Sequence, residues 1–319
     1  MRWLTSLADR SERFWFGSPD LRALDRVRIG LSLCLLVEFA LLWPHVPLLY
    51  GPNGLAPLHL APHWIQTPFL GSVFLHLRSD TAVHAIYAVF LLGLGCLLLG
   101  WQTRWAKLVV WALHLSLYFR NQNAVYGADR VVSCALFLLV LAPIGRHYAL
   151  DARHRRWDFL VPERASVVGR LLKLQLLVLY AYAGLGKLRF DHWWRGDAIW
   201  RALVNPEFGS AALADWFAQH AWLGAVLTHL TLVAEISYPF LVFQARLRPW
   251  VVLGMMALHA GIAVVLGLVY FSGVMIAVNL VWLTESDGLR AAFAELARCS
   301  ERQGPRRMKR EADQRGLER

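Results

Sequence analysis

Lys187 and Glu235 are the ionisable residues whose positions point most directly to chemistry. Each belongs to a long apolar stretch, Lys187 at the end of residues 168–188 and Glu235 near the middle of 222–244. An ionisable side chain at the centre of a membrane span costs roughly 2.5–3.5 kcal/mol on insertion scales, so it needs a partner or a function. A desolvated lysine can act as a base, and a buried carboxyl group can hold a proton.

Helical spacing adds polar residues to the same faces. At positions i, i+3, i+7 and i+10, one face of the second stretch carries Thr228, Thr231, Glu235 and Tyr238. Lys173, Tyr180 and Lys187 are spaced seven apart and form a slowly drifting stripe. Gly184 and Gly186 remove bulk beside Lys187, which allows close approach of a neighbouring helix or of a flat ligand. The structural alternatives are hydrogen bonds between helices and a lysine that extends to the membrane interface.

A third polar group lies near the end of the apolar stretch 105–119. One face carries, at i, i+4 and i+7, the residues His114, Tyr118 and Asn121. The turn that follows contains Arg120 and Asp129, which could form a salt bridge that closes the loop. This group indicates either a polar site or a structural turn.

The histidines give no indication of a metal. His259 is a single histidine in the apolar stretch 249–269, a position typical of a hydrogen-bonded packing residue as well as of a ligand. No histidine within the predicted spans has another His or a Glu four residues away, the spacing of a metal site on a helix, and no nucleotide-binding loop or nucleophile elbow occurs. We expect no metal cofactor.

Membrane helices must position these residues. The chain has 319 residues, of which 57% are hydrophobic and 17% charged, whereas soluble domains carry about 25% charged residues. A span needs about 20 apolar residues, and the candidates are 27–47, 81–100, 105–119, 130–146, 168–188, 222–244, 249–269 and 271–284. We predict an all-α, polytopic bundle of about eight transmembrane helices, with seven as the rival count.

The basic residues predict the orientation. With both termini cytoplasmic, 24 of the 33 Lys and Arg residues fall inside and 7 outside. Because basic residues collect in cytoplasmic loops, this ratio favours an even number of spans and places Lys187 outside. It also explains the net charge of +11 without nucleic-acid binding. Residues 1–285 are then one membrane domain that begins with an amphipathic interfacial segment, 1–22, and residues 286–319 are a basic cytoplasmic tail.

Two longer connections are expected on the outer face. Residues 48–80 are rich in proline, and residues 189–221 contain Trp193 and Trp194 among charged side chains. Both are too apolar for free loops, so we expect them at the membrane interface, with short helices.

An ordered set of short motifs narrows the interpretation. In chain order these are Val27-Arg-Ile-Gly-Leu, Tyr50-Gly-Pro-Asn-Gly-Leu-Ala-Pro57, Gly100-Trp-Gln-Thr-Arg104, Arg120-Asn with Gly127-Ala-Asp129, Ala142-Pro-Ile-Gly145 with Ala149-Leu-Asp151, Tyr182-Ala-Gly-Leu-Gly-Lys187 with Trp194-Arg-Gly-Asp197, Glu235 with Pro239, and His259 with Tyr270-Phe-Ser272. Over about residues 20–285 the set resembles the horizontally transferred transmembrane (HTTM) domain, the membrane part of vitamin K-dependent gamma-carboxylase-like proteins. The resemblance implies a helical bundle that handles a quinol at the exoplasmic side.

The resemblance also implies site residues. In the carboxylase, a lysine in an Ala-Gly-x-Lys-Lys-Leu segment is the base on vitamin K hydroquinone, whose oxygenation yields a stronger base that deprotonates glutamate before CO2 is added. The matching segment here is Ala183-Gly-Leu-Gly186-Lys187-Leu188, in which Gly186 replaces the first lysine. We expect Lys187 to be the base, with a cofactor site formed by Tyr180, Gly184, Gly186, His114, Tyr118, Glu235 and His259. On the substrate side we expect Arg120, Asn121, Asp129, Trp194 and Asp197.

The expected function is therefore a multi-pass enzyme of the bacterial cytoplasmic membrane. It would use vitamin K hydroquinone or a menaquinol-like cofactor, as a carboxylase or oxygenase would, on a periplasmic or membrane substrate. Only the basic tail follows residue 285, where the carboxylase has a large lumenal domain. A second interpretation is thus a non-enzymatic biogenesis or export factor for a secreted peptide. A transporter is the third, although no internal repeat favours it. The expected partners are membrane lipids and a periplasmic peptide or protein.

Overall fold

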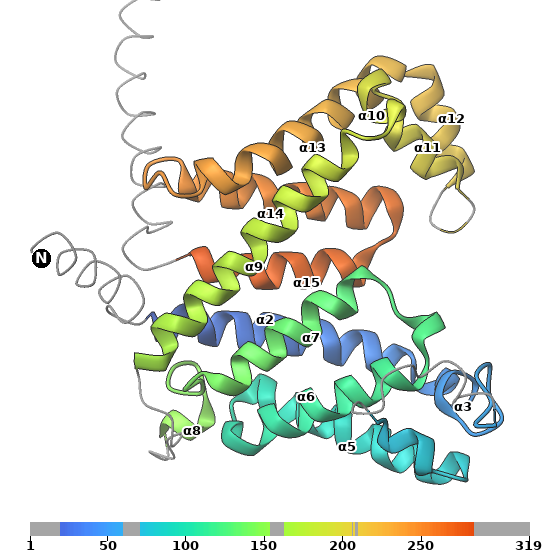
Figure 1. Cartoon of the computed structure of the whole chain (residues 1–319), viewed down its shortest axis with the longest axis vertical. Coiled ribbons are helices and arrows are strands. Elements are labelled where there is room, and N and C mark those ends of the chain that lie inside the picture. The colour runs from blue at the N-terminus through green and yellow to red at the C-terminus, as the bar shows by residue number, and fades with distance from the viewer. Residues whose placement is uncertain (1–19, 60–70, 154–162, 206, 208–209, 284–319) are drawn as a thin grey trace, which may run out of the picture.

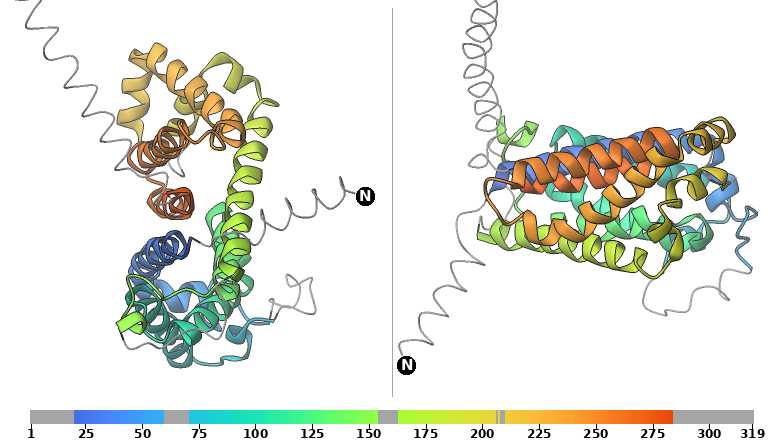
Figure 2. Two further views of the ribbon diagram at one scale, coloured as in Figure 1. Left: turned by 90° about the vertical axis from the view of Figure 1, so that its left-hand side faces the viewer. Right: turned by 90° about the horizontal axis from the view of Figure 1, so that it is seen from above.

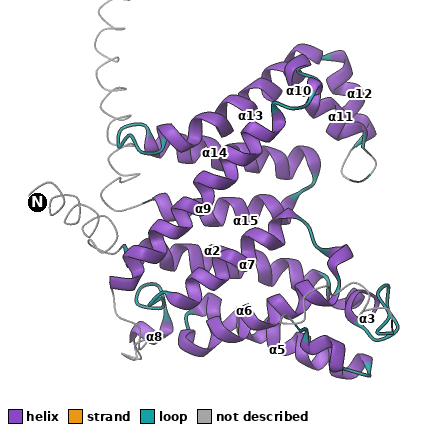
Figure 3. Cartoon of the chain, viewed as in Figure 1, coloured by secondary structure: helices purple, strands orange, loops and turns teal. Residues whose placement is uncertain are grey.

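The computed structural model describes residues 20–59, 71–153, 163–205, 207 and 210–283. Within these residues every regular element is an α-helix or a short 3-10 helix, and no strand occurs (Figure 3). The predicted all-α fold is confirmed. The predicted cytoplasmic tail, 286–319, lies outside the described residues, as does all but the last three residues of the predicted interfacial segment.

A helix of more than ten residues overlaps each of the eight predicted stretches. These helices are α2 (Leu21–Leu41), α5 (Asp80–Leu99), α6 (Thr103–Arg120), α7 (Gly127–Leu141), α9 (Glu163–Lys187), α13 (Ala221–Leu241), α14 (Arg248–Leu266) and α15 (Val269–Asn279). Of these, α2, α7 and α15 end several residues before the predicted limits. Among the described helices, four are long and apolar enough to cross a membrane, namely α5, α9, α13 and α14. A fifth is α2 if the segment beyond its 54° bend belongs to the same span. The count of eight spans and the orientation stay predictions.

Short helices occupy the connections. They are η1 (Trp43–His45), α3 (Val46–Tyr50), η2 (Val73–His76), η3 (Gln122–Ala124), α8 (Leu150–Arg153), α10 (Asp191–Arg195), α11 (Ala198–Val204), α12 (Ala211–Gln219) and η4 (Leu280–Trp282). The two long connections expected on the outer face thus do contain short helices. In Figure 1 the connections predicted outside lie at one end of the long helices, and those predicted inside lie at the other.

The long helices form two groups joined by α9 and α15. One group contains α2, α5, α6 and α7, and the other contains α13, α14 and the corner formed by α10, α11 and α12 (Figure 1). Helix α15 packs between α14 and α2, while α9 runs along the side of both groups and contacts α13 and α7 (Figure 2). Side chains on α9 and α15 can therefore meet side chains from either group.

Small residues set the contact between α2 and α15. A Cβ atom at Gly30 would lie 2.9 Å from the Cβ of Ala277, and one at Gly273 would lie 2.8 Å from the Sγ of Cys34. Close packing of this kind holds helices together in lipid, where the hydrophobic effect contributes little between them.

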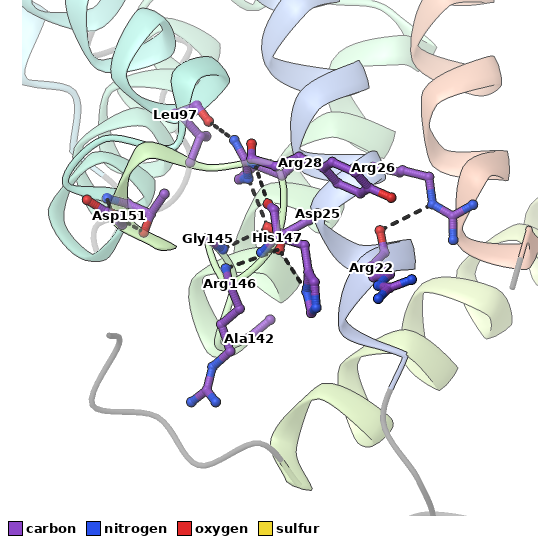
Figure 4. A network of polar contacts seen from close by, with 12 residues as sticks. Arg22, Asp25, Arg26, Arg28, Leu97, Ala142, Gly145, Arg146, His147 and Asp151 are labelled. Atoms are coloured by element: carbon purple, nitrogen blue, oxygen red, sulfur yellow. Dashed lines mark hydrogen bonds and ion pairs between the residues drawn. The ribbon is translucent and has the colours of Figure 1, made fainter. Parts of the chain in front are cut away.

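Asp25 and Arg28 form a fully buried ion pair where α2 begins, 3.0 Å between Oδ1 and Nε. The Asp25 carboxylate also accepts hydrogen bonds from the backbone N–H groups of Gly145, Arg146 and His147 (Figure 4). Arg28 donates to backbone carbonyls at the end of α5 and in the turn after α7. Because both charges are fully hydrogen-bonded, they can be buried and can fix this turn against α2.

A second buried carboxylate closes the turn between α5 and α6. Asp151 accepts hydrogen bonds from the backbone N–H groups of Gln102 and Thr103, at 2.9 and 2.8 Å, and from the Thr103 hydroxyl at 2.7 Å. Several of the motifs that carry the family resemblance therefore meet at the end of the bundle where α2 and α6 begin. Their contacts there are structural.

Candidate functional site

Lys187 and Glu235 form one ion pair, with 2.5 Å between Nζ and Oε2. Lys187 is the last residue of α9, and Glu235 lies on the buried face of α13 with Thr228, Thr231 and Tyr238. The two side chains are 22% and 9% exposed. In a pair so sheltered from water, each charge depends on the other, because removal of one leaves its partner poorly solvated.

Gly184 brings the two helices close enough for this pair. A Cβ atom at Gly184 would lie 2.8 Å from Cγ1 of Ile236 and 3.2 Å from Cβ of Glu235. A Cβ atom at Gly186 would meet no atom within 4 Å. The sequence left open whether these glycines admit a neighbouring helix or a flat ligand. Gly184 makes room for the neighbouring helix, while Gly186 leaves open space beside Lys187.

Trp193 covers the amine from the side of α10. The Lys187 Nζ lies 5.2 Å from the centre of the Trp193 ring, within the range of a cation–π contact. The neighbouring Trp194 donates from Nε1 to the Leu188 carbonyl at 2.8 Å, and its own carbonyl lies 3.3 Å from Nε2 of His229 on α13. The sequence placed Trp194 on the substrate side, where the structure shows these backbone contacts, and did not single out Trp193 for the site.

A buried hydrogen-bond network connects α9, α13, α14 and α15. The Tyr180 hydroxyl lies 2.9 Å from Nε2 of His259 and accepts a hydrogen bond from Nδ2 of Asn279 at 2.8 Å. The Tyr238 hydroxyl donates to Oδ1 of Asn279 at 2.8 Å. Tyr180 and His259, both expected at the site, thus meet. Asn279 was missed, although a lone amide in the apolar stretch 271–284 stands out by the same argument as Glu235.

This network lies one helical turn from the ion pair. Glu235 and Tyr238 are three residues apart on one face of α13, which corresponds to about 4.5 Å along the helix axis. The rings of Tyr238 and Tyr180 are 4.4 Å apart. Ion pair and network together form the candidate site.

His114 belongs to a second polar cluster on α6, α7 and α15. Its Nε2 lies 4.0 Å from Oδ1 of Asp129, and its Nδ1 lies 3.3 Å from the Ser133 hydroxyl. The Tyr270 hydroxyl donates to Asp129 Oδ1 at 3.1 Å. Burial, reinforced by nearby carboxylates, raises the pKa of Tyr126 in the adjoining turn, so this phenol stays neutral. The residues expected around one cofactor are thus divided between two clusters.

Arg120 and Asn121 hold the segment that follows α3. The Arg120 guanidinium donates to the carbonyls of Tyr50, Gly51 and Ala56, at 3.0, 2.5 and 2.7 Å. Asn121 donates from Nδ2 to the Leu49 carbonyl, near the end of α3, at 2.9 Å. The salt bridge considered between Arg120 and Asp129 is not formed within the described residues, because the arginine is directed at these carbonyls.

The last two expected residues have local contacts. Tyr118 packs against Phe119, with 5.1 Å between ring centres. Asp197 precedes α11 and forms an ion pair with Arg201 at 2.8 Å, in which both side chains are substantially exposed. In the described part of the chain, no three His, Cys, Asp or Glu side chains converge as metal ligands would.

Comparison with known proteins identifies the family to which this chain belongs. A family model described as HTTM domain matches residues 58–286. Sporulation-delaying protein SdpB of Bacillus subtilis (strain 168) is 23% identical over 129 residues, which are 38% of this chain and 38% of that protein. The match therefore spans well under half of this relative. No solved structure matches the chain.

Proposed function

Because the chain belongs to the HTTM domain family, we propose that it is an integral enzyme of the bacterial cytoplasmic membrane that uses a quinol-like cofactor. In this proposal Lys187 takes a proton from the cofactor at the exoplasmic side, and the reaction modifies a periplasmic or membrane substrate. The supporting observation is the ion pair between Lys187 and Glu235, 2.5 Å apart. When bound, the cofactor would supply a redox-active ring with two hydroxyl groups.

The pair suits proton removal because it can release a neutral amine. Lysine accepts a proton only when it is uncharged, and the Glu235 carboxylate is in direct contact to receive the ammonium proton. In a poorly solvated site, a neutral amine beside a neutral carboxylic acid avoids the cost of two buried charges. A quinol hydroxyl resembles a phenol, with a pKa of about 10, close to that of an ordinary lysine.

The surroundings of Lys187 fit an aromatic ring. The amine is partly exposed, the position beside Gly186 is open, and the Trp193 indole offers a face for stacking. These residues would hold the ring beside Nζ of Lys187, and Glu235 would contact the same amine. The chain's own contribution is to orient the ring, to limit water, and to move one proton between two atoms.

The first experiment is organic extraction and mass spectrometry of gently purified protein. Wild type is expected to retain a stoichiometric amount of quinone. Lys187→Ala and Glu235→Gln are each expected to reduce the amount of quinone that copurifies. Asp191→Asn is the control, since Asp191 forms an exposed ion pair with Arg195 on α10. Bulk phospholipid alone in wild type and in all folded variants would contradict the proposal.

A non-enzymatic biogenesis or export factor for a secreted peptide is the second candidate. It is favoured by Gly186, which leaves this chain with one amine where the carboxylase segment has two lysines. A peptide or protein that copurifies with wild type and with Lys187→Ala to the same extent would support this candidate. Loss of quinone-dependent oxygen uptake in Lys187→Ala would instead support the enzyme.

A further inference from the structure

His229 presents both of its ring nitrogens to backbone carbonyl oxygens. Nδ1 lies 2.8 Å from the Ala225 carbonyl, one turn earlier on α13, and Nε2 lies 3.3 Å from the Trp194 carbonyl on α10. A neutral imidazole carries a hydrogen on only one nitrogen, so in either tautomer one of the two carbonyls would face a second acceptor. The imidazolium carries a hydrogen on each nitrogen and can donate to both. The geometry therefore fits the charged form of this histidine.

The position of His229 lets it exchange a proton without any opening of the bundle. The side chain is exposed. It lies six residues before Glu235 on α13, about 9 Å along the helix axis toward the corner formed by α10, α11 and α12. Histidine is the side chain whose charge ordinarily changes between about pH 5 and 8. The contact with Trp194 can therefore form or weaken with pH.

No carboxylate in the described part of the chain forms an ion pair with His229. Three acidic residues on the elements around it are paired with other cations, as Lys187 with Glu235, Asp191 with Arg195 and Asp197 with Arg201. The remaining titratable side chains of this corner are Tyr182, Arg189, His192, Glu207, Asp215 and His220. The two carbonyls are thus the hydrogen-bond partners that favour a proton on each nitrogen of His229.

Gly196 allows α10 to lie directly against α13 at this point. It caps the C-terminal end of α10 with φ at +79°. A Cβ atom at Gly196 would lie 2.8 Å from Cβ of Ala225 and 3.0 Å from Cε1 of His229. The ring of His229 is therefore in contact with the end of α10 as well as with the carbonyl it faces.

Helix α10 carries the aromatic ring that covers the Lys187 amine. The centre of the Trp193 ring lies 5.2 Å from Nζ of Lys187. The next residue, Trp194, holds α10 from two sides, since its indole donates to the Leu188 carbonyl after α9 and its own carbonyl faces His229. Of these two contacts, the one with His229 involves a titratable group. The charge of His229 is thereby connected to the position of Trp193.

We propose that His229, as an imidazolium, is a positioning residue that holds α10 against α13 and keeps Trp193 over the Lys187 amine. Loss of one proton leaves Nε2 or Nδ1 as an acceptor facing a carbonyl, and the hold on α10 is weakened. The hold itself needs no cofactor, whereas its effect on a bound ring rests on the proposed function. The site is then closed by Trp193 at lower pH and more open at higher pH.

Hydrogen exchange of full-length protein in detergent, followed by mass spectrometry, tests the hold on α10. The amides of Trp193 and Asp197 are hydrogen-bonded within this segment and report its release. After correction for intrinsic rates, protection in residues 189–197 of wild type should fall about tenfold between about pH 5.5 and about pH 8, as for the loss of one charged hydrogen bond. His229→Arg, which stays charged and can donate, should be protected at both pH values. His229→Phe keeps a ring without a donor and should be poorly protected at both.

His220→Phe is the matched control. His220 makes the same contact with the carbonyl four residues earlier, 2.9 Å from Trp216, and in the described part of the chain its Nε2 faces no second carbonyl. It should retain the pH dependence of wild type. A second readout is acetylation of Lys187 by acetic anhydride at about pH 8, which should be several-fold slower in His229→Arg than in wild type because Trp193 stays in place.

Protection in residues 189–197 that does not change with pH in wild type would overturn the inference. So would a pH dependence that persists in both His229 variants or disappears in His220→Phe. Equal acetylation of Lys187 in wild type and His229→Arg would also overturn it. These measurements are made without added quinone, so they can fail while the proposed function stands. Absence of quinone from purified wild type would overturn the proposed function and leave the hold on α10 unaffected.

Discussion

Lys187 Nζ lies 2.5 Å from Oε2 of Glu235, although 48 residues and three short helices separate the two in the chain. The contact depends on the packing of α9 against α13, since each side chain lies on the face that its helix turns to the other. It places the Lys187 amine beside a carboxylate that can share its proton.

We predict that the two residues are coupled in stability. Lys187→Met or Glu235→Gln alone should lower the free energy of unfolding by about 2–3 kcal/mol, less than for a fully buried pair because Lys187 is partly exposed. The double substitution Lys187→Met with Glu235→Gln should cost no more than either single change, since no charge is left without a partner. Unfolding in detergent, followed by circular dichroism, measures all three; losses that simply add would contradict the coupling.

A second prediction concerns the buried network. Asn279→Leu should lower the free energy of unfolding by about 2 kcal/mol, because it leaves the Tyr238 hydroxyl without its acceptor and the Tyr180 oxygen without its donor. The control is Tyr182→Phe, which changes a phenol on the same helix that is 79% exposed. Equal free energies of unfolding for Asn279→Leu and Tyr182→Phe would show that the network contributes nothing to stability.

The sequence was sufficient to predict the helices and their polar faces. Glu235 and Tyr238 were assigned to one face from their spacing, and both are buried on α13. The pairing of Glu235 with Lys187 could not be predicted, because it depends on which helices become neighbours. For the same reason His114 was grouped with Lys187, although it contacts residues of α7.

The tertiary contacts made by residues at the ends of helices also could not be predicted from the sequence. Arg120 was expected on the substrate side, yet it binds carbonyls about 70 residues earlier in the chain. Trp194 was expected on the substrate side, yet its neighbour Trp193 contacts the Lys187 amine, which depends on how α10 lies against α9 and α13. Spacing within a helix therefore predicts faces, whereas it gives no information on tertiary partners.

The two glycines beside Lys187 give a matched test. Gly184→Ala should be destabilising by about 1–3 kcal/mol, because the new methyl group would lie 2.8 Å from Ile236 and would force α9 away from α13. Gly186→Ala meets no atom within 4 Å and should change stability little. If Ile236→Val restores part of the stability of Gly184→Ala, the loss comes from this contact. Equal stability of the two alanine variants would contradict the close approach of the helices.

The last prediction concerns the role of Arg120 as a structural anchor. Arg120→Lys keeps the charge but cannot reproduce a guanidinium that donates to three carbonyls at once. We expect faster amide hydrogen exchange in residues 49–56, together with a loss of about 2 kcal/mol in the free energy of unfolding, since buried acceptors and a charge lose partners. Arg195→Lys, in an exposed ion pair, is the matched control and should change neither quantity. Unchanged exchange in residues 49–56 of Arg120→Lys would mean that this segment is held by other contacts.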